Sequence, residues 1–60
     1  MPSPVRFAVV KKLLEEKGYR LDRISGSHHI FRKPGAPAQN IPVHHNQVKH
    51  VYYRKAQEAT

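Results

Sequence analysis

The first apolar residues of the chain recur with the period of a helix. Phe7, Val10 and Leu14 fall at positions i, i+3 and i+7, with Val9 beside them. Lysines and glutamates occupy most of the remaining positions and supply a polar face. This spacing predicts an amphipathic helix over Val5–Lys17.

The ends of this segment carry helix start and stop signals. Pro4 suits the first helical position, and Ser3 precedes it as a candidate N-cap. Gly18 stands where a residue of left-handed conformation commonly ends a helix. We therefore expect the helix to begin next to Pro4 and to stop before Gly18.

Three short runs typical of β-strands follow. Turn signals at Ser25–Ser27 and Pro34–Pro37 separate them. Pro42 has no N–H to donate to a sheet, so the third strand is expected at an edge. The predicted strands are Tyr19–Ile24, His28–Lys33 and Gln39–His44.

The last segment again has a helical period, and it completes the order α-β-β-β-α. Val48, Tyr52 and Ala56 recur at i+4, and Asn46 can cap a helix that runs to about residue 59. We expect an α+β fold: a two-layer sandwich with a three-stranded antiparallel sheet and both helices on one face. The other face of the sheet is left open. The apolar residues available for the core are Phe7, Val9, Val10, Leu13, Leu14, Tyr19, Leu21, Ile24, Ile30, Phe31, Ile41, Val43, Val48, Val51 and Tyr52.

A length of 60 residues without a cysteine excludes large classes of protein. So short a chain forms one domain, predicted to span residues 1–60, and has no room for a doubly wound cofactor fold or a catalytic barrel. It can form neither a disulfide nor a thiolate metal site. No apolar run approaches the about 20 residues of a membrane span, and residues 1–10 lack the layout of a signal peptide. We expect a soluble cytoplasmic protein without a small-molecule cofactor.

The charge of the chain indicates the kind of partner it binds. Eleven Lys and Arg against four Asp and Glu give a formal net charge of +7 and a pI of about 10.3. Such a balance favours a phosphate-bearing partner, above all RNA. An acidic protein would satisfy the same charge.

The densest motif is Gly26–Phe31, in which a turn glycine precedes a strand that opens with two histidines. Successive side chains of a strand point to opposite faces, so His28 and His29 cannot do the same work. If Phe31 points into the core, His29 shares its face and His28 lies on the open face. If Ile30 is the core residue instead, the assignment is reversed.

An exposed histidine beside cationic side chains suits general acid–base chemistry, because imidazole exchanges a proton near neutral pH. RNA carries its own nucleophile, the ribose 2′-hydroxyl, so such a reaction requires no metal. The alternative is that His28 only hydrogen-bonds the backbone. A zinc site is disfavoured, because adjacent pairs such as His28–His29 and His44–His45 are poorly spaced for a metal and cysteine is lacking.

The cationic residues fall into three sets, on the first helix, the first hairpin and the last helix. Contacts to phosphate give affinity without sequence information, although a single surface cation is ordinarily just solvated. The candidate RNA-binding residues are Arg20, Arg23, His29, Arg32, Lys33, His44 and Lys49.

Several segments resemble the HicA (YcfA-like) toxin family. They are Gly26–Phe31, Leu13–Leu21 with its helix-ending glycine before an aromatic residue, and Ile41–His44. The resemblance implies a fold similar to the double-stranded RNA-binding domain and the activity of an endoribonuclease that cuts mRNA. It also implies a HicB-like antitoxin partner. By resemblance, His28 matches the catalytic histidine, Gly26 and Ser27 form the supporting turn, and His29 and His44 match recurrent histidines.

The C-terminal segment departs from the family pattern. Val48–Ala56 is more basic and more aromatic than the glycine-containing segment that the family often has there. This difference bears on the antitoxin contact, the RNA preference and the toxicity, and leaves the His28 motif intact. The alternative function is a non-catalytic RNA-binding module on the same fold, and a weaker one is a domain that binds an acidic protein.

Overall fold

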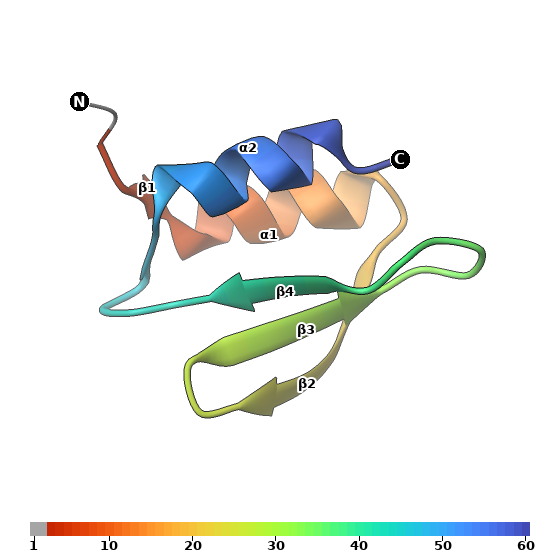
Figure 1. Ribbon diagram of the computed structural model, residues 1–60, viewed down its shortest axis with the longest axis horizontal. Coiled ribbons are helices and arrows are strands. Elements are labelled where there is room, and N and C mark those ends of the chain that lie inside the picture. The colour runs from red at the N-terminus through yellow and green to blue at the C-terminus, as the bar shows by residue number, and fades with distance from the viewer. Residues whose placement is uncertain (1–2) are drawn as a thin grey trace.

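Two helices lie on one face of a three-stranded antiparallel sheet in the computed structural model, which describes residues 3–60 (Figure 1). The α+β sandwich predicted from the sequence is confirmed. Its boundary at residues 1–60 includes Met1 and Pro2, which lie outside the described residues. Within residues 3–60, neither helix is long and apolar enough to cross a membrane. The elements are β1 (Val5–Arg6), α1 (Phe7–Glu16), β2 (Arg20–Ser25), β3 (His28–Arg32), β4 (Gln39–Pro42), β5 (Gln47–Val48) and α2 (His50–Glu58).

The sheet has the order β2-β3-β4, so Pro42 lies in an edge strand as predicted. Phe31 is fully buried against the helices, which settles the alternation along β3. His29 lies opposite Ile41, another buried residue, and therefore shares the face that the helices cover. His28 lies on the open face.

The β2–β3 hairpin closes through the two residues Gly26 and Ser27. Gly26 has φ +60°, and Ser27 is not among the residues with positive φ. This is the pattern of a type II′ turn, which requires glycine at its first central position. The turn fixes the register that places Ser25 opposite His28.

The predicted stop of the first helix is confirmed, since α1 ends at Glu16 and Gly18 has φ +96°. The Gly18 N–H donates to the Glu15 carbonyl at 3.0 Å, and the Tyr19 N–H donates to the Leu14 carbonyl at 3.0 Å. These two bonds define a Schellman motif. The motif turns the chain so that Tyr19 enters the core beside Leu14.

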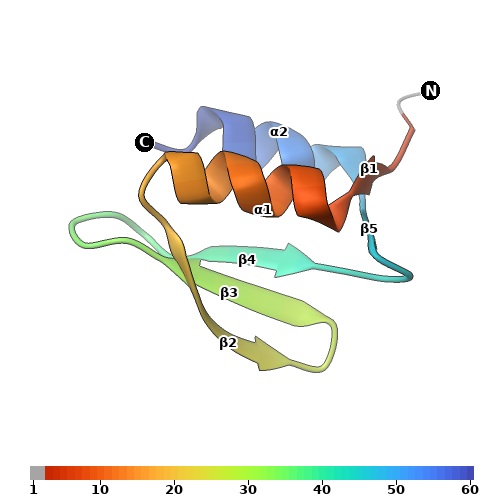
Figure 2. The same cartoon turned by 180° about the vertical axis from the view of Figure 1, so that it is seen from behind.

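The predicted start of that helix is wrong. Val5 and Arg6 were expected in the helix but form the strand β1, which lies beside β5 (Figure 2). In this pair, Val5 lies opposite Val48. Ser3 and Pro4 consequently lie outside α1, whose N-cap position is Arg6, without a side-chain cap. The first helical N–H, from Phe7, donates to the carbonyl of Asn46 at 2.8 Å. A pairing between segments far apart in the sequence thus replaces the local cap.

The predicted cap of the second helix is also wrong. Asn46 and His45 have φ +61° and +53°, and they form a tight turn between His44 and Gln47. Two positive φ values are the pattern of a type I′ turn. The third strand ends at Pro42 rather than His44, and α2 begins only after Lys49. The predicted starts at His28 and Gln39 are confirmed, and the remaining boundaries of the three predicted strands differ by one residue.

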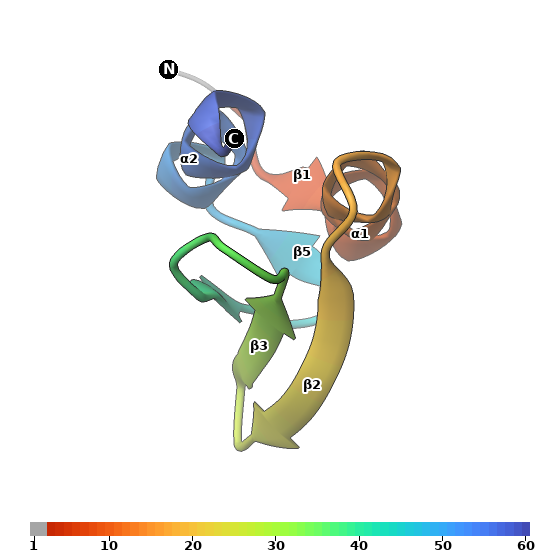
Figure 3. The ribbon, with the colours of Figure 1, turned by 90° about the vertical axis from the view of Figure 1, so that its right-hand side faces the viewer.

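The core lies between the helix layer and the sheet, and the β1–β5 pair closes one end of it (Figure 3). Four of the apolar residues expected in it are exposed instead: Val9, Leu21, Ile24 and Val51, at 47%, 37%, 56% and 53%. Leu21 and Ile24 belong to β2, an edge strand whose six residues are all exposed. The buried core residues are Val10, Leu14, Tyr19, Phe31, Ile41, Val48 and Ala56.

Two lysine ammonium groups bind the C-terminal ends of the helices. Lys17 donates from Nζ to the carbonyls of Ala56, Gln57 and Ala59 at 2.9, 2.5 and 2.7 Å, at the end of α2. Lys33 donates from Nζ to the Lys17 carbonyl, at the end of α1, at 3.0 Å. A cation at this end of a helix satisfies free carbonyls and opposes the helix dipole.

Candidate functional site

A concave pocket lies at the end of the sheet where β3 begins and β4 ends. The β2–β3 turn contributes Ser27, and β3 contributes His28. His44 and Lys49 enter from the segments that follow β4 and precede α2, and Tyr52 comes from the first turn of α2. The pocket has a volume of about 370 Å³, near the small end for ligand clefts. It is therefore suited to holding part of a larger molecule at the surface.

His28 is exposed, and one of its ring nitrogens is anchored. Nδ1 lies 2.9 Å from Oδ1 of the Asn40 side chain. An amide oxygen can only accept a hydrogen bond, so the neutral imidazole donates from Nδ1 and keeps Nε2 as the basic nitrogen. Within residues 3–60, Nε2 has no hydrogen-bond partner. The ring is thus held in one tautomer with a nitrogen available to a ligand.

Sequence reasoning did not identify Asn40. Asn40 lies on β4 opposite Ile30 and diagonally across the sheet from His28. The residues on either side of it in the sequence are ordinary strand residues and do not mark it as a site residue. The contact depends on the register between β3 and β4, which the sequence leaves undetermined. His45 and Tyr52, two further residues of the pocket, were also absent from the candidate set.

His29 lies on the opposite face, apart from His28. Its ring packs on Phe7 with centroids 4.7 Å apart, and its Nδ1 lies 3.2 Å from the Ser27 carbonyl, which can only accept. The two adjacent histidines therefore do different work, as the alternation of a strand requires. His29 contributes to packing and holds the turn that carries His28.

His44 reaches the pocket because the tight turn that follows it folds the chain back. Its N–H donates to the Gln47 carbonyl at 3.0 Å, and the Gln47 N–H donates to the His44 carbonyl at 2.8 Å. This paired hydrogen bonding fixes the backbone at the rim of the pocket. Lys49 then lies at the N-cap of α2, beside the same pocket.

The three arginines of the candidate set lie outside the pocket. Arg20 and Arg32 face each other at the end of the hairpin away from His28, and Arg23 lies opposite Ile30. Arg32 donates from Nε to Asp22 Oδ2 at 3.1 Å, in an exposed ion pair. By the pairing register, these arginines share the open face of the sheet with His28.

Lys33 is likewise not beside His28. Besides its hydrogen bond to the end of α1, its Nζ lies 5.3 Å from the centroid of the Tyr19 ring. The structure thus brings together His28, Ser27, His44 and Lys49 and leaves Lys33 in a structural position. In the described part of the chain, no three His, Asp or Glu side chains come together in a group that could hold a metal ion.

The fold and this pocket define a small basic α+β domain with an exposed histidine held at the start of the central strand of its sheet. Residues 8–56 match the family described as HicA toxin of bacterial toxin-antitoxin. The match covers most of the 60 residues, and the chain belongs to the HicA toxin family. Membership implies a toxin–antitoxin system with an antitoxin partner. No curated protein matches the chain.

Proposed function

We propose that this chain is an endoribonuclease toxin that cleaves mRNA with His28 as its general acid or base. The observation that carries the proposal is the exposed imidazole with Nδ1 anchored on Asn40 and Nε2 open. A positioned histidine next to a cation is the arrangement that proton transfer at a phosphodiester needs. Membership in a toxin family supports a cellular role for such an activity.

The reaction follows from the chemistry of RNA. The ribose 2′-oxygen attacks the adjacent phosphorus, and the bond from phosphorus to the 5′-oxygen of the next nucleotide breaks. Nε2 of His28 either takes the proton of the 2′-hydroxyl or supplies one to the departing 5′-oxygen, and solvent water carries out the other of these two proton transfers. Lys49, which lines the same pocket, stabilises the negative charge that builds on the phosphorane. The products are a 2′,3′-cyclic phosphate and a 5′-hydroxyl, and no metal ion takes part.

We further propose that a HicB-like antitoxin inhibits the chain by covering this pocket. The pocket is open at the surface, and Lys49 in its lining attracts an acidic partner as well as phosphate. In a purified complex, the antitoxin should protect the His28 imidazole from modification by diethyl pyrocarbonate. Equal modification of His28 in the free and bound chain would contradict covering of the pocket.

The mechanism is tested with matched oligonucleotides. The purified chain should cleave an all-ribose RNA and release a cyclic phosphate end. It should fail on the same sequence with 2′-deoxyribose at the cleavage position, while binding both. Cleavage of the deoxy-substituted strand, or products with 5′-phosphates only, would contradict attack by the 2′-hydroxyl. Binding of both strands without any cleavage would instead favour a non-catalytic RNA-binding module.

A further inference from the structure

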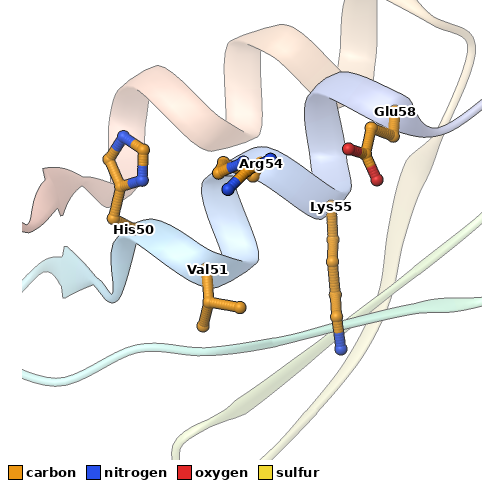
Figure 4. A pocket seen from close by; sticks show the side chains of 5 residues that line it. All are labelled: His50, Val51, Arg54, Lys55 and Glu58. Atoms are coloured by element: carbon orange, nitrogen blue, oxygen red, sulfur yellow. The ribbon is translucent and has the colours of Figure 1, made fainter. Parts of the chain in front are cut away.

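A second hollow lies on the outer side of α2 and is lined by His50, Val51, Arg54, Lys55 and Glu58 (Figure 4). Arg54 and Lys55 are exposed. The ion pair found within residues 3–60 joins Arg32 to Asp22, so Glu58 neutralises neither cation at close range. His50 packs edge-on against Tyr53, with centroids 5.7 Å apart, and is held in place by that contact.

A contact between Lys55 and Tyr52 joins this surface to the His28 pocket. Lys49 lines the pocket and occupies the N-cap of α2, and Tyr52 lines the pocket one turn later. Nζ of Lys55 lies 5.5 Å from the centroid of the Tyr52 ring, so Lys55 is held next to the pocket wall. Arg54 and Lys55 line the hollow together, and Lys55 lies on Tyr52 in the wall of the pocket that Lys49 lines. These three cations, Lys49, Arg54 and Lys55, are termed the α2 track.

We propose that the α2 track binds the phosphate backbone of the RNA strand on one side of the nucleotide held at His28. This inference rests on the proposed function, because it takes RNA as the substrate. Phosphates bind exposed Lys and Arg without regard to sequence. The track would therefore add affinity and set the direction of the strand, and would leave the choice of base to the pocket.

The composition of this surface favours RNA over an acidic protein. The centre of a protein–protein interface is rich in apolar and aromatic side chains. Here Val51 is the one apolar side chain among five that line the hollow. On α1, Lys11 and Lys12 each have a glutamate of their own one turn later, Glu15 and Glu16, whereas on α2 Arg54 and Lys55 share the single Glu58.

This contrast supplies a matched control. Arg54→Gln/Lys55→Gln and Lys11→Gln/Lys12→Gln each remove two positive charges from exposed or partly exposed helix positions. Binding is measured with fluorescent RNA of uniform 2′-O-methyl ribose, which cannot be cleaved through the 2′-oxygen. One oligonucleotide is long enough to span the pocket and α2, and a dinucleotide fills only the pocket. Affinities are recorded over a series of salt concentrations.

For the long RNA, the α2 variant should lower the slope of log affinity against log salt by about 1.4, because each lost phosphate contact on a single strand contributes about 0.7. The α1 variant should leave the slope unchanged. Neither variant should alter binding of the dinucleotide. As a second test, Glu58→Gln should strengthen binding of the long RNA, because a carboxylate at the end of the track repels phosphate.

Equal slopes of log affinity against log salt for the two double variants would overturn the inference. They would show that the RNA responds to the overall positive charge of the chain rather than to contacts on α2. If the α2 variant keeps its RNA slope but loses binding to polyglutamate, the surface is one for an acidic protein and the inference fails. In both cases cleavage of all-ribose RNA by the wild type would leave the proposed function intact. If the wild type neither binds nor cleaves RNA, the proposed function fails and the α2 track fails with it.

Discussion

Lys17 should stabilise the fold far more than an ordinary surface lysine. Its Nζ donates to three carbonyls at the end of α2, and two of these contacts are partly buried. Substitution Lys17→Met keeps most of the aliphatic side chain and removes the ammonium. All three carbonyls then lose the ammonium as a donor, and only that of Ala56 keeps a second one, the Ala59 N–H at 3.3 Å. The favourable interaction with the helix dipole is lost as well.

The magnitude follows from the number and kind of bonds. Hydrogen bonds from a charged group contribute about 1.5–3 kcal/mol each, but three bonds to one ammonium share a single desolvation cost and are not additive. Because part of the Lys17 ammonium is accessible to solvent, we expect Lys17→Met to lower the free energy of unfolding by about 2–3 kcal/mol. At about 0.05–0.15 kcal/mol per residue, the total free energy of unfolding of a chain of 60 residues is about 3–9 kcal/mol. At an unfolding entropy of about 2.1 cal/mol/K per residue, the substitution should therefore lower Tm by about 16–24 °C.

The assay is thermal unfolding followed by far-ultraviolet circular dichroism, with urea unfolding as a second measure. Lys12→Met is the matched control, because Lys12 lies exposed on the same helix without a hydrogen bond in the described structure. It should change Tm by less than about 4 °C, as surface substitutions usually stay within about 0.5 kcal/mol. Equal melting temperatures for Lys17→Met and the wild type would refute the assignment of Lys17 to the end of α2. At a temperature where it is folded, Lys17→Met should bind RNA like the wild type.

Three other substitutions test separate parts of the account. Gly26→Ala should lower stability by about 1–2 kcal/mol, because Gly26 has φ +60° and an added Cβ would meet no atom within 4 Å, so the cost is purely conformational; an unchanged urea midpoint would argue against the turn. Tyr19→Phe should leave stability unchanged or raise it by about 1 kcal/mol, because the hydroxyl of this residue, 1% exposed, has no hydrogen-bond partner within residues 3–60; a clear loss in urea unfolding would show that the hydroxyl is satisfied. Asn40→Leu should lower kcat by at least about tenfold with little change in KM, because the imidazole loses its anchor. Asn40→Asp should restore most of the rate and move the pH–rate profile to higher pH, whereas unaltered kinetics in both variants would remove Asn40 from the mechanism.

Local sequence signals predicted the parts of the fold that local contacts determine. The helical spacing of Phe7, Val10 and Leu14 and the stop at Gly18 depend on residues within a few positions, and both were confirmed. The turn at Gly26 depends on a glycine that can adopt positive φ. These features follow from chain geometry, so a single sequence is sufficient to recognise them.

The features that were missed depend on contacts between distant residues. Val5 and Val48 pair as two-residue strands, and neither sequence segment is long enough to show a strand pattern. Because of this pairing, α1 begins at Phe7 rather than at Val5, and Asn46 lies in a turn rather than at the cap of α2. Ile30 and Phe31 are both apolar, so only the packed structure shows which of them faces the helices.

Some of the predicted site residues lie together in the structure and others lie apart, and their roles stay predictions. His28, His44 and Lys49 do meet at one pocket. Lys33 binds the end of α1. Its positive charge alone could not distinguish it, in the sequence, from cations that are available to a ligand. The Asn40 contact was hidden because it depends on strand register.

Cleavage of RNA by the purified chain in excess chelator, with wild type and His28→Ala compared side by side, tests the central claim most directly. Both proteins are first shown to be folded by circular dichroism. We predict that the wild type cleaves and leaves 2′,3′-cyclic phosphate ends, whereas His28→Ala binds the same RNA without cleaving it. Equal cleavage by the two proteins would contradict the account, because the reaction would then not depend on His28.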